Sequence, residues 1–412
     1  MRKLFMLQGA PGCGKSTLID SLGLSRNTLG YDHFRSLFGT LGHAFDGEVN
    51  SLTQPYELKA IEACQTAAES RMLAGDTLFI DNTNTKNREL TQWKARADNY
   101  GYEMFVVDMQ GDLTDAQLLE RNRNRPEFGR IQPDEIITRM ATAHRQHQKI
   151  AGIQYIRPDQ IQRELWTRVF DANVYNAVVI VGDIQGCGDA LRRLIDEVDS
   201  RDLGKTLWIF VGDYFDRGKN PGMVIEQINS LLPHVIKVEG NHERSVRHTI
   251  TGVKPYRQSV ETLELLHADG YTDEEILAFV NDTTPFFPFR WGGSERWVTH
   301  AGVDPAVLPA PYDGFYKTGL ISNYSFMMGT GHRKEIYRGQ SSYQKFLMPL
   351  DFMHDGTGIG QYFGHRNDED EDPRVYRNIR PLESKAEFGG YLTAILLEPD
   401  KEETLIRVEG EN

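Results

Sequence analysis

The sequence predicts an α/β fold in two domains, and three observations support this prediction. Short apolar runs alternate with polar segments of helical length through residues 1–150, which is typical of strand-helix-strand units and a parallel sheet. A second series of apolar runs begins at Ala177. At 412 residues, the chain also exceeds what one ordinary core supports. We therefore expect one domain over residues 1–155, a linking segment over 156–176 and a second domain over 177–412.

The predicted strands can be taken in order along the chain. The first domain contains KLFMLQG, TLFIDNT and EMFVVDM, and the second contains AVVIVGD, TLWIFVGD, VIKVEGNHE and ERWVTHAG. Each strand of the second series ends in a polar or charged cluster. In open α/β sheets, ligands gather beyond the carboxyl ends of the strands. We therefore expect the four endings of the second series to converge on one site.

Composition limits the setting and the partners of the protein. Three cysteines occur without a Cys-x-x-Cys spacing, so neither a disulfide framework nor a structural zinc site can be assembled from them. No apolar run approaches the roughly 20 residues of a membrane span. We expect a cytoplasmic protein, in a bacterial cell or a phage-infected host, with no membrane partner. Because the net charge is -13, a polyanion would have to bind to local basic clusters.

The segment GAPGCGKST follows the first strand and precedes a helix-compatible segment, which is the context that a phosphate-binding P-loop requires. Its glycines let the backbone bend and turn its N–H groups inward. Lys15 can then reach the terminal phosphates, and Ser16 can hold Mg²⁺. Such a loop does not by itself distinguish a kinase from an ATPase or a GTPase. The predicted phosphate-binding residues are Gly9, Gly12, Cys13, Gly14, Lys15, Ser16 and Thr17.

Two further segments of the first domain bear on its reaction. Asp32 follows soon after the first helix and could take the proton from an attacking hydroxyl, although the same position suits a helix N-cap. The segment RNRNRPEFGR, Arg121 to Arg130, holds four arginines together with a proline and a glycine. This composition is typical of a mobile lid that neutralises a transferring phosphoryl group, and a solvated basic helix face is the alternative.

Together these features resemble the 5′-kinase module of polynucleotide kinases. The resemblance rests on the Asp-x-x-Arg spacing of Asp32 and Arg35, the DNTN segment and the arginine-rich segment. It implies that Lys15 and Ser16 act on ATP and Mg²⁺, that Asp32 is the general base and that Arg35 orients an acceptor 3′-phosphate. By the same resemblance, the acceptor is positioned by Asp81, Asn82 and Asn84, and the donor phosphates are clamped by Arg121 and Arg125.

The second series contributes five polar motifs in order, GDIQGCGD, GDYFDRG, GNHER, THAG and FGHR. Two divalent ions held about 3.5–4 Å apart need a bridging carboxylate and lower the pKa of a shared water, which can then attack phosphorus. Asp213 is the expected bridge. The predicted metal ligands are Asp183, Gln185, Asp213, Asn241, His300 and His365.

The same motifs supply candidates for proton transfer and phosphate binding. We expect His242 to protonate the leaving oxygen, with Asp216 orienting its ring. Arg217 and Arg244 are expected to bind phosphate oxygens bidentately. Gln185 stands where a histidine ligand would be expected. Because an amide oxygen is a weaker donor, the first metal ion should be held less tightly or complete its shell with water.

These motifs resemble the calcineurin-type metallophosphoesterases, which implies an α/β sandwich and two divalent metal ions, expected to be Mn²⁺. The GDIQGC segment is most similar to symmetrical dinucleoside-tetraphosphate hydrolases and to the phosphatase half of bacterial kinase-phosphatases. In that family an aspartate often precedes the closing Gly-Gly, and Glu383 occupies its place. This departure weighs against a substrate contact by Glu383.

A 5′-kinase followed by a calcineurin-type phosphatase resembles bacterial and phage-type polynucleotide kinase-phosphatases, here without a ligase domain. The resemblance implies phosphorylation of 5′-OH ends and removal of 3′-phosphate or 2′,3′-cyclic phosphate ends, with RNA or DNA ends and a separate RNA ligase as partners. The main alternative is a small-molecule or nucleotide kinase joined to a dinucleoside-polyphosphate hydrolase. A third hypothesis is a nucleic-acid sensor with a decayed phosphatase, which only Gln185 supports.

Overall fold

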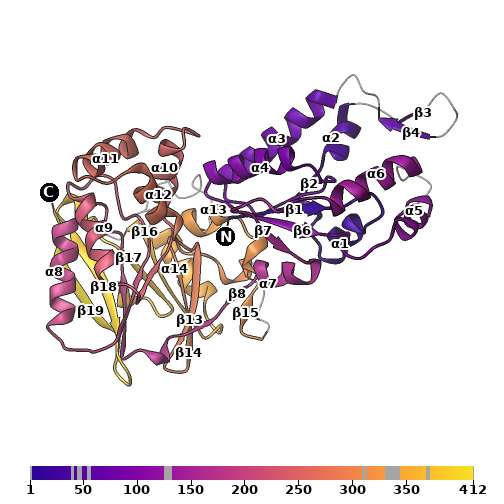
Figure 1. Cartoon of the computed structure of the whole chain (residues 1–412). Coiled ribbons are helices and arrows are strands. Elements are labelled where there is room, and N and C mark those ends of the chain that lie inside the picture. Colours follow the sequence, from indigo (N-terminus) through magenta and orange to yellow (C-terminus); the bar gives the residue numbers. More distant parts are fainter. Residues whose placement is uncertain are drawn as a thin grey trace. The chain divides into compact units, whose positions relative to one another are not determined.

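A computed structural model describes residues 2–38, 41–43, 49–52, 57–124, 132–308, 311, 313–329, 344–367 and 372–411 (Figure 1). The chain forms two compact units. One comprises Met1–Leu165 with Gly319–Ser322, and the other comprises Trp166–Thr318 with Asn323–Asn412. The division therefore falls inside the segment 156–176 that was expected to link two domains. No helix in the described part of the chain has both the length and the apolar character needed to cross a membrane.

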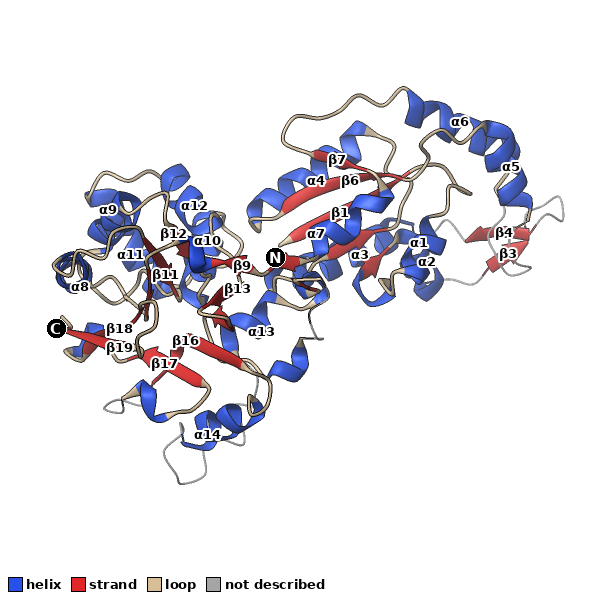
Figure 2. Ribbon diagram, turned by 90° about the horizontal axis from the view of Figure 1, so that it is seen from below, coloured by secondary structure: helices blue, strands red, loops and turns tan. Residues whose placement is uncertain are grey.

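The first unit is built on a five-stranded parallel sheet with helices around it (Figure 2). The order of its strands is β2 (Thr28–Leu29), β5 (Leu78–Ile80), β1 (Lys3–Gln8), β6 (Glu103–Asp108) and β7 (Gln154–Ile156). The helices are α1 (Lys15–Ser21), α2 (Tyr31–Phe38), α3 (Glu57–Leu73), α4 (Asn87–Asn99), α5 (Asp115–Arg123), α6 (Asp134–Arg145) and α7 (Ile161–Leu165). A separate antiparallel pair consists of β3 (Leu41–His43) and β4 (Val49–Leu52).

Strand β1 is buried on both faces, which explains why its sequence is continuously apolar. Leu4 and Met6 belong to a core cluster that includes Trp93 of α4. Phe5 stacks instead between Phe79 and Phe105, with ring centroids 4.6 and 5.0 Å apart. Alternate residues thus fill the two faces, as the two-residue period of a strand requires.

The second unit is a sandwich of two five-stranded sheets. In the first sheet the strand order is β12 (Val235–Lys237), β11 (Thr206–Phe210), β10 (Ala177–Val181), β18 (Tyr391–Leu397) and β19 (Thr404–Glu409). In the second it is β17 (Ile379–Glu383), β16 (Ile359–Asn367), β14 (Ser294–Thr299), β13 (Phe286–Trp291) and β9 (Phe170–Asp171). A short pair joins β8 (Thr167–Arg168) to β15 (Phe315–Tyr316). The α/β class and the sandwich predicted from the sequence are confirmed.

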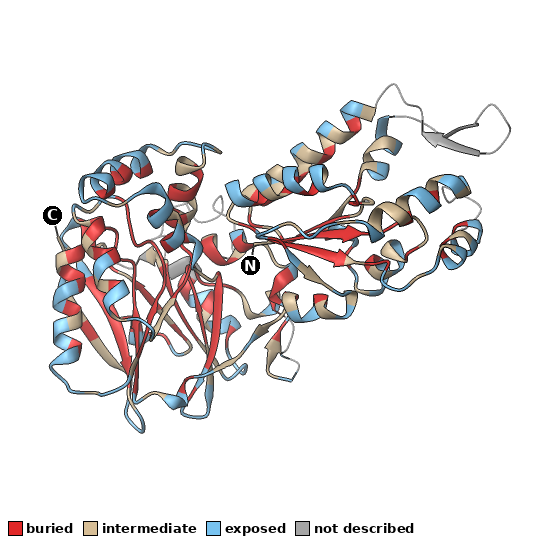
Figure 3. Ribbon diagram, viewed as in Figure 1, coloured by how far each residue is buried: buried red, intermediate tan, exposed pale blue. Residues whose placement is uncertain are grey.

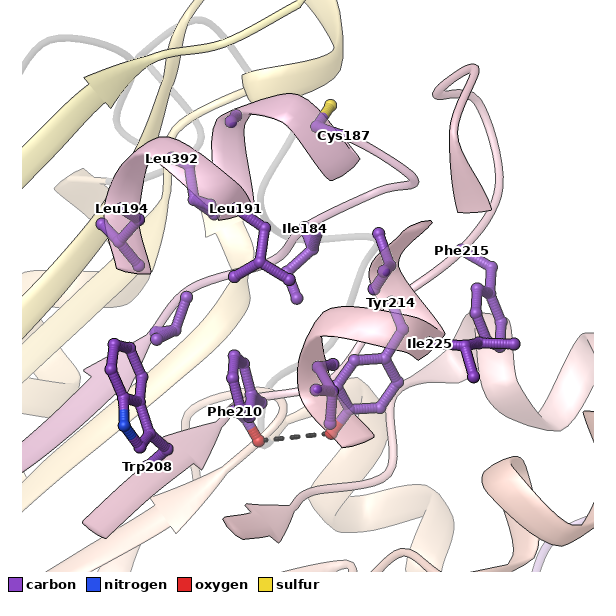
Figure 4. Close-up of a cluster of buried hydrophobic side chains, with 14 of the residues drawn as sticks. Ile184, Cys187, Leu191, Leu194, Trp208, Phe210, Tyr214, Phe215, Ile225 and Leu392 are labelled. Atoms are coloured by element: carbon purple, nitrogen blue, oxygen red, sulfur yellow. Dashed lines mark hydrogen bonds between the residues drawn. The ribbon is translucent and has the colours of Figure 1, made fainter. Parts of the chain in front are cut away.

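Hydrophobic cores lie on both faces of the first sheet of this unit. Val178 and Ile180 of β10 pack between the two sheets, whereas Val179 and Val181 belong to the core on the helical face. On the helical face, Figure 4 shows Leu191 and Leu194 of α8 opposite side chains of β11. The buried strands lie beneath helices with exposed outer faces (Figure 3). The helices of this unit are α8 (Gly188–Asp199), α9 (Pro221–Ser230), α10 (Asn241–Ile250), α11 (Arg257–Ala268), α12 (Asp273–Asn281), α13 (Asn323–Met328) and α14 (Gln344–Met353).

Candidate active sites

The P-loop of the first unit connects β1 to α1 and is held from outside by neighbouring strand ends. The Gln110 side chain accepts a hydrogen bond from the Ala10 amide (3.3 Å). Gly12 has φ 91°, and a Cβ atom there would lie 2.8 Å from the Leu118 carbonyl oxygen, so only glycine fits without a shift. The Lys15 ammonium donates to the Gly9 carbonyl at 2.9 Å. This lysine is thus held at the loop, within reach of a phosphate bound there.

A cavity of about 1660 Å³ lies against the P-loop. Pockets that hold one small ligand usually measure about 300–1,000 Å³, so this one has room for a nucleotide and an acceptor together. Asn84 does not line this cavity, and neither do Gly9 and Cys13. The predicted residues that line it are Gly12, Gly14, Lys15, Ser16, Thr17, Asp32, Arg35, Asp81, Asn82 and Arg121.

Asp32 and Arg35 lie one turn apart at the start of α2, and both face this cavity. Arg35 Nη1 is 2.5 Å from Asp32 Oδ1, and Arg35 Nε donates to Glu57 Oε2 at 2.6 Å. Glu57 also lines the cavity, and sequence analysis missed it because a glutamate at the start of a helix has no distinctive signal. The Asp32 side chain remains 62% exposed, so it can still meet an incoming hydroxyl.

The structure contradicts the prediction that Asn84 positions the acceptor. Its residue is 1% exposed, and its amide donates to the backbone oxygens of Leu7 (2.9 Å) and Ile80 (3.0 Å). The side chain thus joins β1 to β5, because a buried amide must find such partners. Asn82 behaves differently, since it lines the cavity and its Oδ1 accepts from the Tyr31 amide at 2.9 Å.

The arginine-rich segment is described only in part. Arg121 lines the cavity, whereas Arg125 lies outside the described residues. Arg139 of α6 also lines the cavity and was missed, since an isolated arginine on an amphipathic helix resembles any exposed charge. The role of Arg125 in clamping the donor phosphates stays a prediction.

In the second unit, the predicted metal ligands lie at or just beyond the carboxyl ends of strands from both sheets. Atoms of Asp213, His300 and His365 lie within 4.8 Å of one another. His300 Nε2 is 3.3 Å from Asp213 Oδ1 and 3.1 Å from Asn241 Oδ1. The structure therefore brings a carboxylate, an amide oxygen and two imidazoles together, which is a set that suits a divalent cation.

Asp183 and Gln185 lie beside this group and carry buried oxygen atoms. Neither Asp183 Oδ1 nor Gln185 Oε1 has a hydrogen-bond partner among the described residues. Gln185 Nε2 donates to Asp213 Oδ2 at 3.1 Å, which leaves the amide oxygen available. Unpartnered buried oxygens are costly, and a metal ion would satisfy them. The residues present thus fit a first metal ion as well as a second.

The backbone around these ligands is unusual. Five non-glycine residues here have positive φ, and such conformations concentrate at functional sites. Gly218 touches the first turn, since a Cβ there would lie 2.2 Å from the Gln185 carbonyl oxygen, and its amide donates to that oxygen at 2.9 Å. The first and second metal-binding turns are therefore locked together. The five residues are Gln185 (52°), Asp213 (52°), Asp216 (68°), Arg217 (63°) and His365 (59°).

His242 occupies the position expected of a proton donor. Its Nδ1 is 2.5 Å from Asp216 Oδ2, and its Nε2 lies 3.6 Å from Asp213 Oδ2. Burial lowers the pKa of His242, but the two aspartates outweigh it and raise the pKa to about 9. Ser259 and Thr262 of α11 also donate to Asp216. Sequence analysis missed both hydroxyls, because they come from a helix that carries no motif.

The electrostatics of the histidine ligands suit metal binding. Burial, together with the neighbouring His300, lowers the pKa of His365 to about 3, so its ring is neutral at physiological pH. Burial opposes ionisation of Asp213, but His242 and His300 still hold the pKa of this carboxyl below its usual value. A neutral imidazole and an ionised carboxylate are the forms that bind metal ions.

Three other residues support or border this site. Glu243 accepts hydrogen bonds from the backbone amides of Asp213 (2.9 Å), Tyr214 (2.9 Å) and Gly240 (2.8 Å), and so ties two loops together. Arg217 Nη2 lies 3.3 Å from His242 Nε2. The Arg244 guanidinium instead lies over the Tyr324 ring, 5.4 Å from its centroid. Binding of phosphate by the two arginines stays a prediction.

Comparisons with known proteins match a different family to each part of the chain. The calcineurin-like phosphoesterase family matches residues 177–370, and a AAA domain family matches residues 4–148. A symmetrical bis(5′-nucleosyl)-tetraphosphatase of Mannheimia succiniciproducens is 31% identical over 130 residues, which cover 31% of this chain and 45% of that protein. Its counterpart in Legionella pneumophila is 37% identical over 92 residues, covering 22% and 33%. The chain thus spans less than half the length of these relatives.

Among solved structures, a cold-active protein-tyrosine phosphatase of a psychrophilic Shewanella species aligns with a TM-score of 0.40 and 17% identity, over 59% of this chain and 82% of that one. The family matches and the two sites described above assign each half of the chain. The chain thus contains a P-loop domain that matches the AAA family and a domain that matches the calcineurin-like phosphoesterases, the latter similar in sequence to symmetrical bis(5′-nucleosyl)-tetraphosphatases.

Proposed function

We propose that the protein is a bifunctional nucleic-acid end-healing enzyme. The first unit transfers the γ-phosphate of ATP to a 5′-OH end, and the second removes a 3′-phosphate or a 2′,3′-cyclic phosphate. One observation carries this proposal: a single cavity contains the P-loop and, facing it, the carboxylate and guanidinium of Asp32 and Arg35. This pairing offers a base for the acceptor hydroxyl and a cation for a phosphate on the acceptor.

In the kinase reaction, the Asp32 carboxylate accepts the proton of the 5′-hydroxyl as its oxygen attacks the γ-phosphorus. Lys15 leaves the Gly9 carbonyl to bind the transferring phosphate, and Arg121 offsets its charge. Ser16 holds the Mg²⁺ that accompanies ATP. All three guanidinium nitrogens of Arg35 contact Asp32 or Glu57, so the acceptor phosphate binds Arg35 by sharing or replacing one of these contacts.

In the phosphatase reaction, two divalent metal ions, which we take to be Mn²⁺, would when bound supply an activated water and neutralise the phosphate charge. Asp183, Gln185 and Asp213 would hold one ion, and Asp213, Asn241, His300 and His365 the other. His242, whose Nδ1 contacts Asp216, donates its proton to the leaving oxygen. Arg217 binds a phosphate oxygen beside it. The proposed partners are RNA or DNA ends and a separate RNA ligase in the cytoplasm.

A second candidate is a nucleotide kinase joined to a dinucleoside-polyphosphate hydrolase. The sequence similarity to the bis(5′-nucleosyl)-tetraphosphatases favours it. Both candidates use the same P-loop and metal-ligand residues, and they differ only in the molecules that the acceptor pockets hold. The choice between them therefore depends on the substrate.

One assay separates the two candidates. The protein is incubated with γ-labelled ATP, Mg²⁺ or Mn²⁺ and an oligonucleotide with 5′-OH and 3′-phosphate ends, and in parallel with diadenosine tetraphosphate. End healing predicts label on the 5′ end and release of phosphate from the 3′ end. Rapid cleavage of the dinucleotide with no labelled oligonucleotide would refute it. As a matched pair, Asp32→Asn should lower kinase turnover at least about 100-fold, whereas Asp98→Asn, on the surface of α4, should not.

A further inference from the structure

Glu387 lies in a short 3-10 helix, Ala386–Phe388, between β17 and β18. Its side chain is 1% exposed, and its Oε1 accepts a hydrogen bond from Arg217 Nη1 at 2.7 Å. The other carboxylate oxygen, Oε2, is buried and has no hydrogen-bond partner among the described residues. This glutamate therefore contacts the arginine that we assign to phosphate binding.

The loop that carries Glu387 is held by its backbone. Lys385 and Gly389, on either side, have φ of 55° and 79°. The Glu411 amide donates to the Ala386 carbonyl at 2.6 Å, and the Gly389 amide donates to the Glu411 carbonyl at 3.0 Å. The carboxylate of Glu387 is therefore placed by a fixed turn, and Arg217 adjusts to it.

Arg217 is held by Glu387, and its guanidinium remains partly exposed. Its side chain is 33% exposed, and Nη2 lies 3.3 Å from His242 Nε2. Glu387 engages Nη1 and His242 contacts Nη2, and the exposed third of the side chain lets a substrate reach the guanidinium beside His242. Burying a carboxylate with one unpartnered oxygen costs stability, and such a pair is weak evidence for a stabilising role. The contact instead suggests a role in the site.

Glu387 also changes the charge that a substrate meets. It adds a carboxylate to a part of the unit that already holds Asp183, Asp213, Asp216 and Glu383. Because the Glu387 carboxylate contacts the arginine assigned to phosphate binding and its side chain is 1% exposed, water screens its charge little from an anion bound at that arginine. A doubly charged phosphomonoester is therefore repelled more than a singly charged phosphodiester.

We propose that Glu387 is a positioning residue that holds the Arg217 guanidinium in place and biases the second site toward singly charged phosphodiesters, the class that includes 2′,3′-cyclic phosphate ends. This inference rests on the proposed phosphoesterase function of that site. It deepens the function by naming the charge state that the site prefers.

The test compares kcat and KM for p-nitrophenyl phosphate, a dianion at pH 8, and bis(p-nitrophenyl) phosphate, a monoanion. Glu387→Gln keeps an oxygen near Arg217 but removes the charge, and we expect it to shift the ratio of kcat/KM toward the monoester by about tenfold. Glu387→Asp keeps the charge on a shorter side chain. It should preserve the ratio and raise KM for both esters.

Glu403→Gln is the matched control, because Glu403 forms a similar half-buried pair with Arg380 (2.6 Å) in the same unit. It should leave the ratio unchanged. A ratio in Glu387→Gln within twofold of the wild type would overturn the proposal and leave Glu387 as a structural residue.

Two further outcomes keep the inference separate from end healing. If the wild type cleaves both nitrophenyl esters but no oligonucleotide end, end healing fails, and the ratio still decides the role of Glu387. If it cleaves neither ester, calorimetric titration of the metal-loaded protein with inorganic phosphate at pH 8 decides instead. Glu387→Gln must then bind phosphate about tenfold more tightly than the wild type, and equal affinity overturns the proposal.

Discussion

At the residue scale, Gln185 shows how one side chain can serve a metal site without being a typical ligand. Its amide nitrogen donates to Asp213, and its buried oxygen is left without a partner among the described residues. This orientation directs the oxygen to the place where a first metal ion would bind. The residue therefore fits a loosened metal site better than a decayed one.

We predict that Gln185→His binds the first metal ion roughly tenfold more tightly, because imidazole nitrogen is a stronger ligand than an amide oxygen for Mn²⁺ and similar ions. Calorimetric titration of Mn²⁺ into EDTA-treated protein measures the change. Gln227→His is the matched control, since Gln227 also has a buried oxygen without a partner among the described residues but lies in α9. Equal affinity in wild type and Gln185→His would mean that Gln185 is a bystander.

His242 makes the stability of the metal-free protein depend on pH. Its pKa of about 9 in the folded state exceeds the ordinary value of 6.5. The stabilisation is therefore complete below about pH 6.5 and is lost as the pH rises through about 9, and it amounts to about 2–4 kcal/mol. Thermal unfolding of EDTA-treated protein between pH 6 and 9.5 should show a steeper fall for the wild type than for His242→Asn. Parallel curves would contradict the assignment.

At the scale of elements, both sites depend on turns that follow strands. The P-loop connects β1 to α1, the turns that carry the other metal ligands follow β10, β11, β12 and β14, and His365 lies near the end of β16. Glycines allow these turns to pass close to neighbouring backbone, as at Gly12 and Gly218. Each site thus depends on close backbone approaches that leave no room for a Cβ atom.

We predict that Gly12→Ala weakens ATP binding at least about tenfold, because the left-handed backbone alone costs about 1–2 kcal/mol and the methyl group also meets the Leu118 carbonyl. Calorimetric titration with ATP measures this loss. Gly23→Ala has a similar positive φ (65°) with no atom within 4 Å, so it should lower stability slightly and leave ATP affinity intact. Loss of binding in both variants would indicate general destabilisation instead.

At the scale of the whole molecule, the two units have separate cores and separate sites. We predict that Lys15→Ala abolishes only kinase activity and that Asp213→Ala abolishes only phosphatase activity, each by at least about 100-fold. Both activities are measured on one oligonucleotide with 5′-OH and 3′-phosphate ends. If either substitution removed both activities, the two sites could not be independent.

The sequence by itself determined the α/β class, the strands that lead into both sites, the P-loop and the motifs of the metallophosphoesterase. These features were predictable because each depends on local spacing: a strand has a period of two residues, and a loop motif occupies consecutive positions. Asp183 and Gln185 illustrate this, since both follow directly from the end of β10.

Only the tertiary structure decided which side chains from distant segments join those motifs. Glu57 pairs with Arg35, Thr262 donates to Asp216, and Glu387 contacts Arg217 from 170 positions away in the chain. None of the three lies in a recognisable motif. Asn84 shows the reverse case, because its place after a strand suggested a ligand contact and packing turned it inward to join β1 and β5. The local sequence pattern predicts the backbone conformation of a segment. The burial and the hydrogen-bond partners of a side chain depend on surfaces that meet only when the chain is folded.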